Sequence, residues 1–112
     1  MSHQDLIQEI QVIRRYSQLV LDHTREMSLE DYLQDQFVRL AVERSIMIIG
    51  EASARIRDGY PDVYEQIESF RSAIGVRNRL AHGYDDLIDD EAIWSIVETG
   101  LPSMLEEIEG VI

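Results

Sequence analysis

Apolar residues recur at steps of three and four along nearly the whole chain, and this spacing limits the possible fold more than any other feature. In the first segment the series is Leu6, Ile10, Ile13, Ser17 and Val20. Such spacing places side chains on one face of an α-helix, and no segment shows the alternation typical of a β-strand. The sequence therefore predicts an all-α fold that begins with a helix near residues 3–23.

A second, longer helix is expected to begin after Ser28 and to run to about Arg57. Ser28 and Asp31 resemble a capping box, in which the two side chains bind free backbone N–H groups at the start of a helix. The apolar stripe expected on this helix consists of Leu33, Phe37, Leu40, Ala41 and Ile48. Gly59 and Pro61 should end it, because glycine accepts a left-handed cap and proline cannot extend the hydrogen-bond ladder.

Gly50 and Ala54, four residues apart on this helix, form a groove of small side chains that would let another helix approach closely. The surrounding stretch 46–56 is apolar on more than one side, which a single packed stripe does not require. The approaching helix could belong to the same chain or to a second subunit. The sequence leaves both possibilities open.

Two more main helices are expected after a short turn around residues 62–66. The apolar series of the first is Ile67, Phe70, Ile74, position 77 and Ala81. The second should begin near Asp89 or Asp90 and be kinked or split at Pro102. Its stripe is Ile93, Val97, Leu101, Met104 and Ile108. The prediction is an up-and-down four-helix bundle with a short extra helical turn, one domain over residues 1–112, paired as a homodimer to bury more area.

The charge is strongly negative but unevenly distributed. The net charge of −12 argues against general nucleic-acid binding, which depends on basic side chains that displace counterions. All ten basic residues are arginine, and seven of them lie in residues 39–79, against six acids there. Arginine can clamp a phosphate through its planar guanidinium, although arginines on helix surfaces also form ordinary ion pairs.

Several classes of protein are disfavoured by what the sequence lacks. It has no cysteine, so neither a disulfide framework nor a cysteine-bound metal is expected. His3 and His23 stand in no recognisable ligand spacing with His82, and we expect no metal or other cofactor. The start of the chain does not resemble a secretion signal and no apolar run is long enough to span a membrane, so a cytoplasmic location is expected.

Position 77 is the exception on the third main helix, because a charged guanidinium occupies the seam expected to face the interior. The segment from Arg77 to His82 and Tyr84 resembles the signature of HEPN-superfamily ribonucleases, in the Arg-x4-His-x-Tyr form of HepT toxins. The resemblance extends over essentially the whole chain. It includes residues 48–52, Asp89 with Trp94, and Leu101-Pro102.

This resemblance implies a toxin that cleaves RNA, such as tRNA or mRNA, without a metal ion. RNA carries its own nucleophile, the ribose 2′-hydroxyl, so the protein needs a group that moves a proton and a donor for the charge on the phosphate. His82 would be the general acid or base and Arg77 would hold the scissile phosphate. Arg79 would assist RNA binding, while Asn78 would orient these groups or simply lie on the surface. The product would be a 2′,3′-cyclic phosphate.

The resemblance also gives Tyr84 a role and names a partner. In HepT systems a minimal nucleotidyltransferase antitoxin transfers AMP to the tyrosine of this motif, which here is Tyr84. An added phosphate at the rim of the site would repel RNA. The alternative for Tyr84 is an ordinary packing role. The alternative for His82 is an interaction with the helix dipole alone. The rival function is a catalytically silent helical module that scaffolds a nucleotidyltransferase, with Arg77 in a buried ion pair.

Five positions correspond to about 140° of rotation on an α-helix, so Arg77 and His82 cannot share one face of a straight helix. One solution is that the helix ends at His82, which frees its ring to turn back. The other is that two copies of the segment meet across a twofold axis and form one composite cleft, as HEPN dimers do. The second solution makes the homodimer part of the expected active site.

Overall fold

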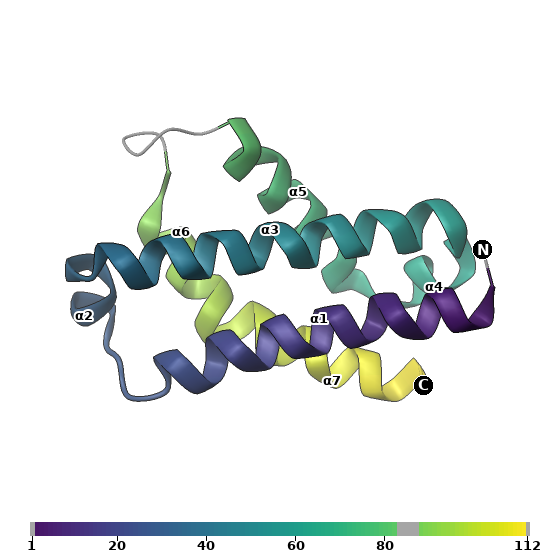
Figure 1. Cartoon of the computed structure of the whole chain (residues 1–112), viewed down its shortest axis with the longest axis horizontal. Helices are drawn as coiled ribbons and strands as arrows, with labels where there is room; N and C mark the ends of the chain where they lie inside the picture. Colours follow the sequence, from purple (N-terminus) through teal and green to yellow (C-terminus); the bar gives the residue numbers. More distant parts are fainter. Residues whose placement is uncertain (1, 83–87, 112) are drawn as a thin grey trace.

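The computed structural model describes residues 2–82 and 88–111, and every regular element in these ranges is a helix. The elements are α1 (His3–Thr24), α2 (Leu29–Gln34), α3 (Gln36–Gly59), α4 (Pro61–Gln66), α5 (Glu68–His82), α6 (Asp90–Ser95), the π-helical turn η2 (Ile96–Gly100) and α7 (Leu101–Val111) (Figure 1). The predicted all-α class is confirmed. The expected short turn around residues 62–66 is a helix, α4, with Pro61 at its first position, where a missing N–H is harmless.

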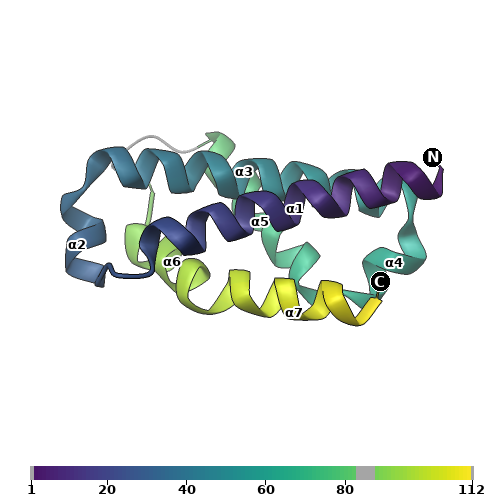
Figure 2. The ribbon, with the colours of Figure 1, turned by 60° about the horizontal axis from the view of Figure 1, so that its bottom comes forward.

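The long helices α1 and α3 lie side by side and run antiparallel (Figures 1 and 2). The C-terminal elements α6, η2 and α7 follow one another along this pair, and α5 crosses α3 obliquely (Figure 1). The molecule measures 42 × 29 × 19 Å along its principal axes, so it is flat. A flat bundle leaves much of each helix close to the surface, which matters for the site on α5.

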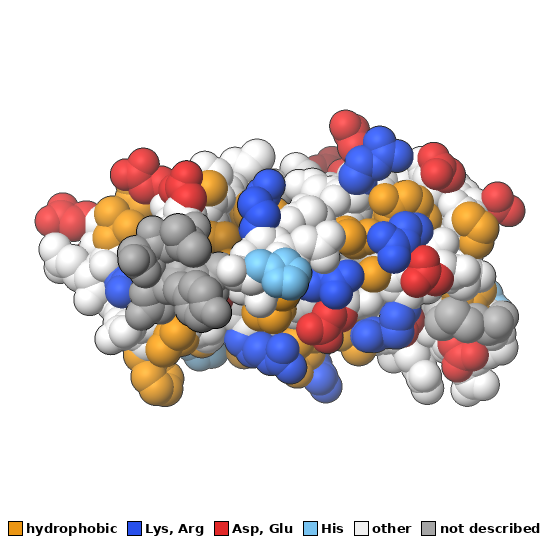
Figure 3. Space-filling view, turned by 90° about the horizontal axis from the view of Figure 1, so that it is seen from above, with side chains coloured by type: hydrophobic (Ala, Val, Ile, Leu, Met, Phe, Trp, Pro, Cys, Tyr) orange, Lys and Arg blue, Asp and Glu red, His pale blue; other side chains and the backbone are white. Residues whose placement is uncertain are grey.

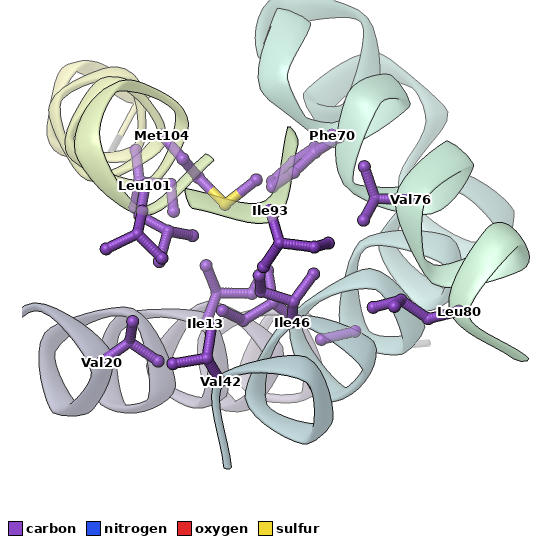
Figure 4. Packing of buried hydrophobic residues seen from close by; sticks show 14 of the residues in the cluster. Ile13, Val20, Val42, Ile46, Phe70, Val76, Leu80, Ile93, Leu101 and Met104 are labelled. Atoms are coloured by element: carbon purple, nitrogen blue, oxygen red, sulfur yellow. The ribbon is translucent and has the colours of Figure 1, made fainter. Parts of the chain in front are cut away.

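The core fills the space between the α1–α3 pair and the remaining helices (Figure 4). The stripe predicted on α1 is confirmed, since Ile10, Ile13, Ser17 and Val20 are buried. Opposite them, Ile93, Leu101 and Met104 contribute from the C-terminal helices, and Phe70 and Val76 from α5. Burial of this apolar set is the main contribution that stabilises the bundle.

The second predicted helix is wrong in one respect that changes the surface. The Ser28–Asp31 capping box is present, but α2 ends after six residues because Asp35 adopts an extended conformation. The Asp35 carboxylate then caps α3 by accepting a hydrogen bond of 3.1 Å from the Val38 N–H. The predicted stripe is also misplaced, with Leu33, Phe37, Leu40 and Ala41 exposed. The face of α3 that is buried instead includes Val42, Ile46, Ile49 and Ile56.

The last predicted helix starts where expected but is not one regular α-helix. Asp89 caps α6, accepting a 3.1 Å hydrogen bond from the Ala92 N–H. A π-helical turn then precedes Pro102, and the Leu101 N–H donates to the carbonyl of Ile96, five residues back. Proline has no N–H to donate, and a π-turn is one way for a helix to absorb such a gap. The interruption expected at Pro102 is therefore present as a local widening of the helix.

Candidate functional site

α5 presents one apolar side to α3 and the core and one polar side to the surface. Phe70, Ile74, Val76 and Leu80 are its buried residues, with Ile67 buried just before it. Ala81, the last member of the predicted series, is exposed. Arg77, predicted to occupy the seam that faces the interior, is half-buried, whereas its neighbour Val76 is buried.

The stem of Arg77 packs directly on Gly50 of α3. A methyl group built on Gly50 would overlap the Arg77 Cβ and would lie 2.8 Å from the carbonyl oxygen of Ala73 and 3.0 Å from the Arg77 Cγ. Contacts this close leave no room for any side chain at position 50. Of the two partners that the sequence left open for the small-residue groove, the structure shows a helix of the same chain at Gly50.

Arg77 has no electrostatic partner among the residues that the structure describes, and its Nε atom is buried without a hydrogen bond. Eight of the ten arginines do have a partner, and the exceptions within the described ranges are Arg77 and Arg79. The eight are Arg14, Arg25, Arg39, Arg44, Arg55 and Arg57 in ion pairs, and Arg15 and Arg71 in hydrogen bonds to tyrosines.

A buried guanidinium nitrogen without a partner costs free energy, commonly about 1–3 kcal/mol for an unsatisfied polar group. Arg77 therefore does not stabilise this chain as a member of an internal ion pair. Its terminal amino groups have no acceptor in the described structure and are not among its buried unpaired atoms. The arrangement leaves them available to an acceptor supplied from outside.

His82 is the last residue of α5 and is exposed. Because α5 is continuous from residue 77 to residue 82, the two side chains point about 140° apart around the helix axis. The residues after His82 lie outside the described ranges, so the solution in which the helix ends at His82 stays a prediction. Within one copy, the Arg77 stem packs on Gly50 of α3, while His82 is exposed.

Asn78 and Arg79 are both exposed on α5. Asn78 lies one helical turn before His82 on a similar face, with no hydrogen bond between the two. Arg79 lines a small cavity of about 100 Å³ between α5 and α6, together with Leu80, Ile88 and Asp89. The proposed modification site, Tyr84, lies outside the described residues.

Arginine side chains gather over the middle of the face that carries α5 and α3, with a histidine among them (Figure 3). This fits the locally positive segment found in the sequence.

In residues 2–82 and 88–111 no group of three or more histidine, cysteine or acidic side chains is placed to hold a metal ion. In the same ranges, no helix combines the length and the apolar character needed to cross a membrane.

Sequence reasoning missed an apolar surface on α1, α2 and α3. Phe37 is 84% exposed, and Leu40, Leu19 and Leu33 are also exposed. A groove of about 240 Å³ beside Phe37 is lined mainly by apolar side chains such as Leu19, Val38 and Ala41. We call Leu19, Leu33, Phe37 and Leu40 the apolar patch. Asp35, a good capping residue within the supposed single helix, was a sequence signal for the break between α2 and α3.

Comparisons with known proteins test the family resemblance found in the sequence. Residues 8–111 match the family model described as Ribonuclease HepT-like. A protein of Thermococcus cleftensis named "Probable ribonuclease HepT" is 32% identical over 108 residues, covering 96% of this chain and 94% of the relative. A "Putative RNase" of Methanocaldococcus jannaschii is 32% identical over 93 residues, covering 83% of this chain and 75% of the relative. This chain therefore belongs to the HepT-like ribonuclease family.

Proposed function

We propose that this chain is a metal-independent endoribonuclease of the HepT toxin type, in which Arg77 and His82 carry out the cleavage of RNA. The observation that supports this most is the state of Arg77. Its stem packs on Gly50 and its Nε is buried and unpaired, whereas eight other arginines each have at least one partner within the described structure. A cation kept without an internal partner, at the free energy cost given above, is suited to an anionic ligand such as a phosphate.

In this proposal the 2′-hydroxyl of the ribose attacks the adjacent phosphorus and the 5′-oxygen of the next nucleotide leaves. His82 takes or gives the proton, and its exposure at the end of α5 gives RNA access to it. Arg77 offsets the negative charge that grows on the phosphate oxygens. Arg79 binds the RNA backbone and Asn78 contacts the same region. The products are a 2′,3′-cyclic phosphate and a 5′-hydroxyl.

A second copy of the chain completes the site in this proposal. Arg77 and His82 point about 140° apart on one continuous helix, so one copy does not direct both at the same phosphate. The exposed apolar patch offers a surface for pairing, since exposed clusters of large apolar side chains commonly mark protein interfaces. A homodimer would also bring the two arginine-rich faces into one groove.

The direct test is cleavage of tRNA by the purified protein in the presence of a chelator, compared with His82→Ala. We expect the wild-type protein to cut the RNA and leave 2′,3′-cyclic phosphate ends, and the variant to lose this activity by at least about 100-fold. Gel analysis of the fragments and mass spectrometry of their ends provide the measurement. Because His82 is exposed, its removal should leave thermal stability almost unchanged.

Two results would contradict the proposal. Absence of cleavage of both tRNA and mRNA by a folded wild-type protein would favour the rival, a silent helical module that scaffolds a nucleotidyltransferase. Equal cleavage by His82→Ala would remove the histidine from the mechanism.

The proposal includes a minimal nucleotidyltransferase antitoxin that silences the enzyme by transferring AMP to Tyr84. We expect cells that express Tyr84→Phe to stop growing even when the antitoxin is present, because the hydroxyl that accepts AMP is missing. Intact-mass measurement should show the AMP increment on the wild-type protein and none on the variant. Normal neutralisation of Tyr84→Phe would exclude this role for the hydroxyl.

A further inference from the structure

We infer that Gly50 is a positioning residue for Arg77, and this inference rests on the proposed function. Its basis is the close approach of α3 and α5, where the absent side chain of Gly50 leaves the space that the Arg77 stem occupies. In this view the glycine acts on the reaction through the guanidinium and does not itself contact RNA.

The contact is tight on both sides of the arginine stem. A Cβ on Gly50 would meet Arg77 at Cβ and Cγ and would also meet the backbone oxygen of Ala73, one turn earlier on α5. Neither the Cβ atom nor the backbone oxygen can swing away as the end of a flexible side chain could. Any residue other than glycine must therefore push α5 outward as a unit.

The size of that displacement follows from ordinary packing distances. Van der Waals contact normally begins at 3.4 Å, whereas the Ala73 oxygen would lie at 2.8 Å. α5 must then move by at least roughly 0.5 Å, because a close-packed interior absorbs little of such a change. Misplacing a catalytic group by about 1 Å can reduce the rate about 100-fold.

The burial of the Arg77 Nε gives the second, independent observation. This atom is buried without a partner, while the side chain as a whole is only half-buried. The stem thus packs on α3 at Cβ and Cγ and is covered as far as the Nε, whereas the terminal amino groups are not among the buried unpaired atoms. Such a fixed stem limits the rotation of the phosphate-binding end, which is how positioning contributes to catalysis.

The chain supplies matched control glycines. Gly75, on α5 itself, and Gly110, on α7, have open space where a Cβ would be added. Gly75→Ala and Gly110→Ala carry the same chemical change in a helix and should slightly stabilise it. Of these three substitutions, only Gly50→Ala combines the stabilisation of the helix with a collision against Arg77.

The test measures two properties of Gly50→Ala against both controls. We expect its kcat for RNA cleavage to fall about tenfold or more, with a smaller change in KM, while Gly75→Ala and Gly110→Ala keep wild-type values. We also expect hydrogen exchange at the Arg77 Nε–H, followed by heteronuclear NMR, to become faster. Arg77→Lys, which lacks this group, assigns the signal.

The NMR measurement separates this inference from the proposed function. A wild-type protein that does not cleave RNA would defeat the proposed function, but accelerated exchange in Gly50→Ala would still show that the glycine holds Arg77. Unchanged exchange, or cleavage by Gly50→Ala at the rate of the controls, would overturn the inference. If Gly50→Ala does not fold, fast exchange at Arg77 in the wild-type protein would overturn it instead.

Discussion

Replacing Arg77 by methionine is expected to lower the kcat for RNA cleavage by about 10²–10³-fold, the loss typical of removing one donor to a developing oxyanion. The same substitution should leave the free energy of unfolding unchanged or raise it by about 1 kcal/mol. Methionine keeps an unbranched apolar stem against Gly50 and removes the buried, unpaired Nε. Steady-state kinetics and thermal unfolding of the same preparation measure both effects.

Opposite changes in activity and stability distinguish the catalytic role from the structural one. If Arg77 were part of a buried ion pair, its loss would destabilise the protein by roughly 3–5 kcal/mol. Arg25→Met is a control, because Arg25 is exposed and forms an ion pair of 2.8 Å with Asp22 on α1. It should change neither property appreciably. A strongly destabilised Arg77→Met, or one that cleaves normally, would contradict the assignment.

Phe37→Glu is expected to separate the proposed homodimer and to reduce cleavage by about 100-fold or more, since each copy would then lack half of the composite cleft. Phe37 is 84% exposed, so the monomer should lose little stability, within about 0.5 kcal/mol. A carboxylate placed in an apolar interface must be desolvated without a partner, which strongly opposes pairing. Light scattering of the eluted protein should show half the wild-type mass.

Gln8→Glu provides the matched control for charge. Gln8 is exposed near the start of α1, away from the apolar patch, and its substitution adds one negative charge to the same protein. This variant should remain dimeric and active. A Phe37→Glu monomer that cleaves RNA at the wild-type rate would rule out an active site composed of two copies. A variant that stays dimeric would show that the two copies pair through another surface.

The sequence alone was sufficient for the class of fold and for most helix boundaries. Apolar spacing gave α1 with its buried face, and local rules gave the Ser28 cap, the stop before Pro61 and the start at Asp89. These features depend on interactions within a few residues, which is why they can be read from the chain. The Arg77–His82 motif and the family resemblance were also found in the sequence. The match to the family model confirmed the family.

Only the tertiary structure showed which face of each helix is buried and which residues far apart in the sequence are in contact. Asp35 interrupts the predicted helix, and Phe37 and Leu40 lie on the exposed face of α3 although their spacing fitted a buried stripe. The sequence marked Gly50 as a small residue but not its neighbour, because the approach of α5 depends on packing 27 positions away. Likewise, the sequence showed ten arginines, but only the folded chain showed which ones have a partner, since ion pairs such as Arg55 with Glu9 join residues far apart in sequence.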